Sequence, residues 1–199
     1  MKLIVNEKNI DTKEITTATQ MVEKIQTLAD DDIINQVTIN AQDVYDDFEA
    51  YLEQHWQSIE YIKVITQSKK QFINDTLLTA ENYLDNAVDL VQELSNNFYQ
   101  KPGAEDWNQF QYFTEGITWF SNILVTIDSL KERPNNWKCY VDQYHKLEDG
   151  IKELAEAVEA DDETLIADII QYEMIPIYQN LKKLISNTID TEGCRPHAH

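Results

Sequence analysis

The hydrophobic pattern of the chain is densest at residues 107–130, where six of the first fourteen positions are aromatic. Successive residues of a helix are about 100° apart, which divides the apolar residues of this segment into two neighbouring stripes. One stripe contains Phe110, Phe113, Ile117, Phe120, Leu124 and Ile127. The other contains Tyr112, Trp119, Ile123 and Leu130. Because a helix with one buried face has a narrower apolar stripe, we predict a central helix that contacts at least two neighbours.

Three more segments have hydrophobic residues at helical spacing, namely 68–99, 136–159 and 162–188. Short polar or proline-containing links separate the four segments. Four long helices joined by short links are typical of an up-down antiparallel four-helix bundle. Pro176 lies inside the last segment, where its missing N–H group is expected to bend the helix.

The first third of the chain has shorter patterns. Strands are predicted near 2–6, 36–40 and 59–66, and helices near 13–28 and 42–56. Part of the pattern recurs 34 residues later, because Val5-Asn6 with Ile10 has the same internal spacing as Ile39-Asn40 with Val44. The recurrence is compatible with a duplication and with chance. It is too short to indicate a solenoid.

These patterns predict an α+β fold that is mainly helical. A small α/β domain is expected at 1–67, with three to five short strands and two helices on one face of the sheet. The four-helix bundle is expected at 68–190. The polar residues 191–199 are expected to form a disordered tail.

Charge narrows the classes of partner. The chain has 36 acidic and 16 basic residues and a formal net charge of −20. Such a charge repels phosphate backbones and anionic lipids, so we expect neither nucleic acid nor a membrane as a partner. It suits a basic protein partner, although it also serves solubility alone. The two cysteines form no disulfide framework, and Leu3-Ile4-Val5 is too short an apolar run for a signal peptide, so a cytoplasmic location is expected.

One helix carries an unusual series of acids. Glu81, Asp85, Asp89 and Glu93 follow one another at intervals of four residues, and no lysine or arginine lies between Lys70 and Lys101. Like charges at this spacing weaken a helix slightly. The series, here called the acidic strip, is interpreted as a solvated face, as a docking strip for a basic partner, or as a cation-binding face. It lacks the central glycine and ligand spacing of a calcium loop.

Motifs that would indicate catalysis are missing from the sequence. A di-metal bundle needs paired Glu-x-x-His motifs, and Asp142-x-x-His145 stands alone. Cys194, His197 and His199 are three potential ligands, fewer than structural zinc requires. The chain has no glycine-rich phosphate loop and no nucleophile elbow. We therefore expect a protein that is not an enzyme, with no cofactor.

Two functional hypotheses remain open. In the first, the chain is a non-catalytic interaction or assembly module that binds itself or another protein through Tyr112, Trp119, Ile123 and the acidic strip. In the second, it is a small-molecule-binding or metal-binding bundle, conceivably an enzyme, with a pocket near Gly116 and Pro176. Gly116 lies in the apolar arc of the central helix and costs up to about 1 kcal/mol relative to alanine. A close helix crossing and a ligand slot would each explain it.

Overall fold

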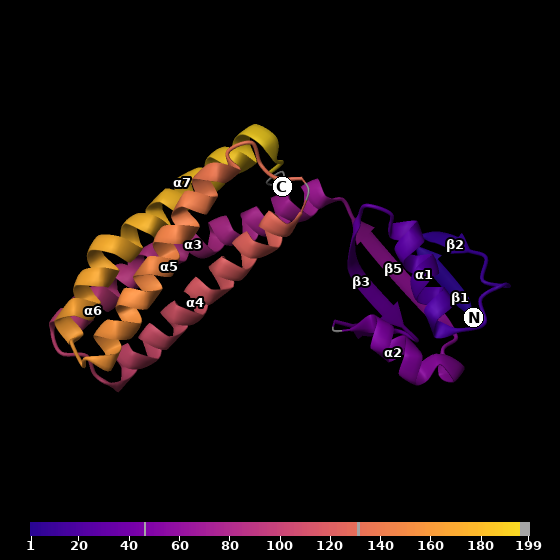
Figure 1. Ribbon diagram of the computed structural model, residues 1–199, viewed down its shortest axis with the longest axis horizontal. Helices are drawn as coiled ribbons and strands as arrows, with labels where there is room; N and C mark the ends of the chain where they lie inside the picture. The colour runs from indigo at the N-terminus through magenta and orange to yellow at the C-terminus, as the bar shows by residue number, and fades with distance from the viewer. Residues whose placement is uncertain (46, 131, 196–199) are drawn as a thin grey trace. The chain divides into compact units, whose positions relative to one another are not determined.

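The computed structural model describes residues 1–45, 47–130 and 132–195. The chain divides into two compact units, Met1–Phe72 and Ile73–His199, where the sequence predicted a boundary between 67 and 68. The first unit contains a small sheet and the second consists of helices (Figure 1). The predicted class, mainly helical α+β with a small sheet followed by helices, is confirmed.

The sheet of the first unit has five strands in the order β2-β1-β5-β3-β4. They are β1 (Lys2–Val5), β2 (Lys8–Ile10), β3 (Ile33–Ile39), β4 (Gln42–Val44) and β5 (Tyr61–Gln67). β1 and β5 run parallel, and every other pair of neighbours is antiparallel. A hairpin therefore forms each edge of the sheet, and β1 and β5 form its parallel pair. This topology by itself indicates no function.

The recurring sequence pattern folds into the same local structure twice. Asn6 and Glu7 connect β1 to β2 with φ angles of 46° and 66°, and Asn40 and Ala41 connect β3 to β4 with 47° and 66°. Two consecutive positive φ angles are characteristic of the type I′ hairpin turn. A helix follows each hairpin, α1 (Ala18–Ala29) and α2 (Phe48–His55), and a 3₁₀ turn, η1 (Trp56–Ser58), follows α2.

One face of this sheet forms the core of the first unit. Alternate strand residues such as Leu3, Val37 and Ile62 are buried, together with Met21 and Ile25 of α1 and Leu52 of α2. Because strand residues alternate between the two faces, both helices cover the same face, as the sequence predicted. The two helices are also linked directly, since Gln26 donates a hydrogen bond of 2.8 Å to Glu49.

The second unit contains four long helical segments that lie alongside one another (Figure 1). The first three are α3 (Lys69–Tyr99), α4 (Ala104–Ser129) and α5 (Trp137–Glu159). The fourth is continuous through α6 (Glu163–Ile169), the π-helical turn η2 (Ile170–Met174) and α7 (Ile175–Glu192). The up-down topology of a regular four-helix bundle stays a prediction.

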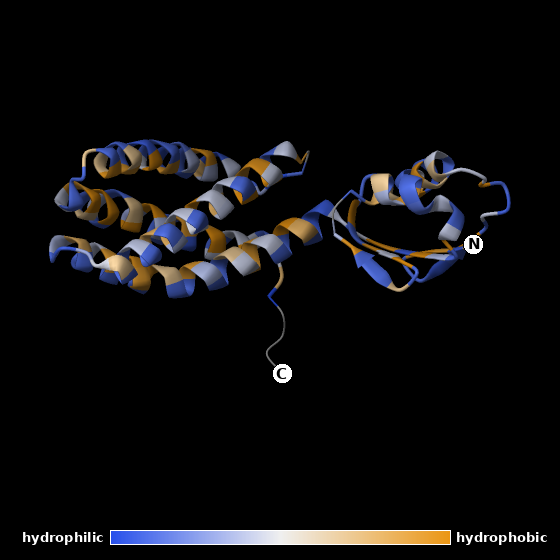
Figure 2. Ribbon diagram, turned by 90° about the horizontal axis from the view of Figure 1, so that it is seen from below, coloured by the Kyte–Doolittle hydropathy of each residue, from blue (hydrophilic) through white to orange (hydrophobic). Residues whose placement is uncertain are grey.

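Apolar and polar residues alternate along these helices (Figure 2). Five residues of the first stripe of α4 are buried, namely Phe113, Ile117, Phe120, Leu124 and Ile127. Tyr178 of α7 packs against this stripe, with its ring centroid 5.9 Å from that of Phe113 and 6.3 Å from that of Phe120. None of the described helices is both long and apolar enough to cross a membrane.

Two features differ from the expectation for the last segment. The π-helical turn lies immediately before Pro176, and its wider backbone gives room for a proline ring that would clash inside a regular α-helix. The helix also continues to Glu192, two residues into the predicted tail. Beyond it, Asn74 binds the backbone of Cys194 through both atoms of its amide, at 2.8 and 3.1 Å.

Candidate interaction groove

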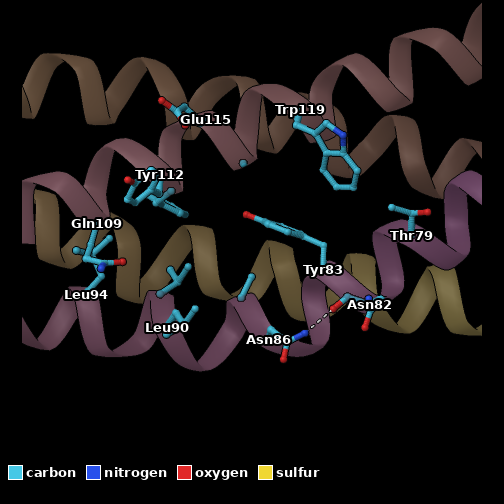
Figure 3. Close-up of a pocket in the computed structure, with 14 residues that line it drawn as sticks. Thr79, Asn82, Tyr83, Asn86, Leu90, Leu94, Gln109, Tyr112, Glu115 and Trp119 are labelled. Atoms are coloured by element: carbon cyan, nitrogen blue, oxygen red, sulfur yellow. Dashed lines mark hydrogen bonds between the residues drawn. The ribbon is translucent and has the colours of Figure 1, made fainter. Parts of the chain in front are cut away.

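A groove of about 650 Å³ runs between α3 and α4, and we call it the α3–α4 groove (Figure 3). From α3 it is lined by Thr79, Asn82, Tyr83, Asn86, Ala87, Leu90, Val91 and Leu94. From α4 it is lined by Gln109, Tyr112, Phe113, Glu115, Gly116 and Trp119. Both walls therefore come from helices of the second unit.

Tyr83 and Gly116 form the floor of the groove. A Cβ atom on Gly116 would lie only 1.9 Å from the hydroxyl oxygen of Tyr83 and 2.9 Å from its Cζ. The tyrosine therefore takes the space that any other residue at position 116 would need. Its ring packs at 5.3 Å from the ring of Trp119 and at 6.0 Å from that of Phe120. A tyrosine side chain of α3, rather than a close crossing of the two helix backbones, therefore fills the space beside Gly116.

Tyr178 of α7 lies behind this floor. Its ring centroid is 6.4 Å from that of Tyr83, and its side chain is fully buried. The Tyr178 hydroxyl has no hydrogen-bond partner among the described residues. Burial raises the pKa of this phenol well above its usual value, and the nearby Tyr83 adds to the rise. The back of the groove is therefore lined by aromatic rings and holds one buried phenol hydroxyl.

Large apolar side chains remain exposed along the groove. Leu90 of α3 is 60% exposed, and Tyr112 and Trp119 of α4 are 65% and 36% exposed. Tyr112 and Trp119 belong to the second stripe of α4, which the sequence predicted to bind a second neighbour. Most exposed apolar residues of a protein stand singly, whereas a contiguous group frequently marks a binding surface.

The structure separates the remaining predicted residues. Ile123 lies further along α4, half-buried and outside the groove lining. Pro176 lines a different hollow of about 380 Å³ between α5 and the η2–α7 segment, together with Gln143, Lys146 and Tyr172. Gly116 and Pro176 therefore do not share the pocket that the second hypothesis assigned to them.

The first half of the acidic strip is occupied by partners from the same unit. Arg195 donates two hydrogen bonds to Glu81, at 2.6 and 2.9 Å, and Ser186 of α7 donates a third. The arginine bonds lower the pKa of the Glu81 carboxyl. Asp85 forms a 2.7 Å ion pair with Lys182 of α7 and raises the pKa of that lysine. These two acids face α7, so the strip as a whole is not a single solvated face.

The second half of the acidic strip borders the groove. Asp89 and Glu93 are exposed, and neither forms a salt bridge within the described part of the chain. They share one helical stripe with Asn82 and Asn86, which line the groove. On the opposite wall Glu115 is exposed and accepts a 2.9 Å hydrogen bond from Gln111. Acidic groups thus lie along both edges of an apolar groove.

Potential metal ligands do not gather elsewhere in the residues that the structure describes. No group of three or more His, Cys, Asp or Glu side chains there could hold a metal ion. His145 approaches Glu148 at 3.6 Å. Cys194 is exposed with a free thiol. His197 and His199, its suggested companions, lie outside the described residues.

Sequence reasoning missed the wall that α3 contributes. Leu90 was not recognised because a single leucine on a polar face gives no signal in the sequence. Tyr83 was not recognised either. Its spacing relative to Leu90 and Leu94 is helical, but the pattern does not show that this stripe faces Tyr112 and Trp119 across a groove.

Comparison with known proteins identifies a family for the second unit. Residues 75–184 match the family described as Domain of unknown function (DUF8042). Because the match covers more than half of the 199 residues, the chain belongs to this family. The matched range includes every residue that lines the α3–α4 groove. No curated protein and no solved structure matches the chain.

Proposed function

We propose that the chain is a non-catalytic protein-interaction module that binds an apolar segment of a partner protein in the α3–α4 groove. The observation that carries the proposal is the convergence of Leu90, Tyr112 and Trp119, exposed on two helices, on one continuous groove. Aromatic residues are enriched among those that dominate the energy of protein interfaces. The groove also lies entirely within the range that matches the family.

The shape of the groove favours a protein segment over a small molecule. Its volume falls within the range of small-molecule sites, roughly 300–1,000 Å³, but such sites bury about 70–90% of their ligand. The α3 wall extends from Thr79 to Leu94, about 22 Å at the rise of an α-helix. With Leu90 and Tyr112 more than half exposed, a long and shallow surface of this kind would cover a small ligand poorly.

The groove is also a poor setting for acid–base catalysis. Of the described lining residues, Glu115 is the one carboxylate, and it is exposed and bound by Gln111. General acids and bases work best when burial and neighbours tune the pKa. The net charge of −20 further supports a protein partner rather than nucleic acid or a membrane surface. Two free, exposed cysteines suit a reducing compartment such as the cytoplasm.

The proposal is tested with the full-length protein and two matched double variants. Leu90→Gln with Tyr112→Gln removes apolar surface from both walls of the groove. Val125→Gln with Tyr172→Gln removes similar side chains, 54% and 70% exposed, that do not line it. All three proteins are used to capture partners from an extract of the source cells, and captured proteins are identified by mass spectrometry.

We expect a partner that the wild type and the Val125/Tyr172 variant capture equally and that the Leu90/Tyr112 variant loses. Circular dichroism of each protein confirms that the helices are retained. Capture of the same proteins by all three, or of none by the wild type, would contradict the proposal.

A further inference from the structure

We infer that the occupant of the α3–α4 groove is a single amphipathic helix of three to four turns that carries Lys or Arg on both sides of its apolar stripe. This inference rests on the proposed function and specifies the partner.

A helix forms its backbone hydrogen bonds within itself. The walls of this groove offer few hydrogen-bond partners to the backbone of any other kind of segment. Every residue that lines it belongs to α3 or α4, so the N–H and C=O groups of the walls are already used within those helices. An extended segment needs a sheet edge to pair with, whereas an amphipathic helix needs only an apolar groove. The α3 wall of about 22 Å accommodates a helix of about 15 residues.

The edges of the groove indicate the charge of the occupant. Glu115 lines the α4 wall. On α3, Asp89 and Glu93 share a helical stripe with the lining residues Asn82 and Asn86, at the edge of that wall. Between Lys70 and Lys131 the sequence has one basic residue, Lys101, in the turn between the two helices. An apolar stripe flanked by Lys or Arg would therefore meet apolar residues at the centre and carboxylates at both edges. Charges at such a rim mainly determine partner choice and association rate.

α7 already binds the same acidic strip in the way that we infer for the partner. α7 lies on one side of α3, where its Lys182 pairs with Asp85 at 2.7 Å. Arg195, shortly after α7, pairs with Glu81. The strip winds around α3, because each step of four residues advances about 40° beyond a full turn. Asp89 lies between the two sides of α3, and its charge also helps to raise the pKa of Lys182. Glu93 is turned furthest toward the groove, where a partner helix would supply the cations.

A second copy of this chain fits the groove poorly. The second unit has 23 acidic and 9 basic residues, a net charge of −14. The edges of the groove are acidic as well, so two copies that met there would repel each other. A basic helix of another protein avoids this repulsion. The sequence left self-association open. If the groove suited an acidic segment of a second copy, the selected peptides would lack basic flanks.

The test uses a displayed library of random 16-residue peptides selected against three full-length proteins. These are the wild type, a variant with Glu93→Lys and Glu115→Lys, and a control with Glu156→Lys and Glu159→Lys. Glu156 and Glu159 are exposed on α5 and line no part of the groove, so the control has the same change in charge at another place. Enriched peptides are then synthesised and titrated against each protein, and against the Leu90/Tyr112 variant described above.

We expect the wild type and the control to enrich peptides with apolar residues at helical spacing and Lys or Arg beside them. The Glu93/Glu115 variant should enrich acidic flanks instead and bind the basic peptides roughly tenfold more weakly. Neutral flanks, a proline-rich motif, or an equal loss of binding on the control would each overturn the inference. If these peptides bind the Leu90/Tyr112 variant as tightly as the wild type, the proposed function fails too. If that variant loses binding but the flanks show no charge preference, only the inference fails.

Discussion

Two buried glycines of the helical unit show how a single residue fixes the distance between helices. Gly116 of α4 faces the phenol of Tyr83, and Gly150 of α5 faces Met174, whose sulfur would lie 2.6 Å from an added Cβ. The two neighbours differ in stiffness. A tyrosine ring moves as a whole, whereas a methionine side chain has three rotatable bonds and fills irregular space easily.

Replacing these glycines by alanine should therefore have opposite consequences. Alanine gains up to about 1 kcal/mol of helix propensity at each position. At position 116 this gain is outweighed, because Tyr83 must leave its contacts with Trp119, Phe120 and Tyr178, and overpacking typically costs about 1–3 kcal/mol. We expect Gly116→Ala to lower the free energy of unfolding by roughly 1–2 kcal/mol. Gly150→Ala should change it by less than about 1 kcal/mol.

Urea denaturation followed by circular dichroism measures both effects, and a second substitution identifies the cause. In a Tyr83→Ala background the clash is gone, so Gly116→Ala should there be neutral or stabilising. A Gly116→Ala protein as stable as the wild type would show that Tyr83 moves without cost and does not fix the width of the groove.

At the scale of the element, the acidic strip does not stay on one face of α3, because residues at intervals of four drift around a helix. Four acids at intervals of four residues look like one face in the sequence. The accumulated rotation of about 40° per step places Glu81 against α7 and Glu93 at the groove. Glu81 and Asp85 therefore form ion pairs within the fold, whereas Asp89 and Glu93 form no salt bridge among the described residues.

The Glu81 contacts should make the stability of the second unit depend on pH. The pKa of Glu81 is lower in the folded protein than its ordinary value of 4.5, first because of Arg195. A carboxyl with a lowered pKa stabilises the fold fully above its unfolded pKa, and this stabilisation disappears as the pH falls through the folded pKa. We therefore expect Glu81→Gln to be less stable than the wild type at pH ~7, with a difference that shrinks as the pH falls below the unfolded pKa of a glutamate.

Chemical denaturation of both proteins at a series of pH values tests this expectation. Glu156→Gln, which removes an exposed carboxylate of α5, controls for the loss of a charge in an acidic protein. A stability difference for Glu81→Gln that stays constant down to pH ~3 would mean that the ion pair with Arg195 contributes nothing that depends on charge.

The elements themselves could be predicted from periodicity far better than their contacts. The long helices appeared within a few residues of their bounds because their apolar residues repeat every three to four positions. The pattern around Asn6 and Asn40 recurred, but the hairpins themselves were not predicted, and residues 42–44, assigned to a helix, form strand β4. Glycine at 116 showed that space was needed, but not that Tyr83, 33 residues earlier, occupies it. Arg195 was assigned to a disordered tail, because polar residues after a helix give no sign of the carboxylate that they reach.

At the scale of the whole molecule, each unit has its own core and its own share of the charge. The buried residues of the first unit form one cluster on the helix-covered face of its sheet. That unit has 13 acidic and 7 basic residues, a net charge of −6, against −14 for the helical unit. Repulsion among like charges opposes the compact state. The stability of the helical unit should therefore increase more than that of the sheet unit when salt screens this repulsion.

Added salt should therefore stabilise the helical unit more than the sheet unit. Between about 0.01 M and about 1 M NaCl the Debye length falls from roughly 30 Å to roughly 3 Å, which removes most repulsion between separated carboxylates. Close but exposed pairs such as Lys182 with Asp85, at 2.7 Å, are weakened by salt as well, which opposes part of this gain. Hydrogen exchange of the full chain, followed by mass spectrometry of its peptides, reports both units in one sample. The sheet unit serves as the internal control, because salt also strengthens the burial of apolar groups in both. A helical unit that gains no more protection than the sheet unit would show that its acids are already balanced locally, and that Asp89, Glu93 and Glu115 exert no unusual attraction on a basic partner.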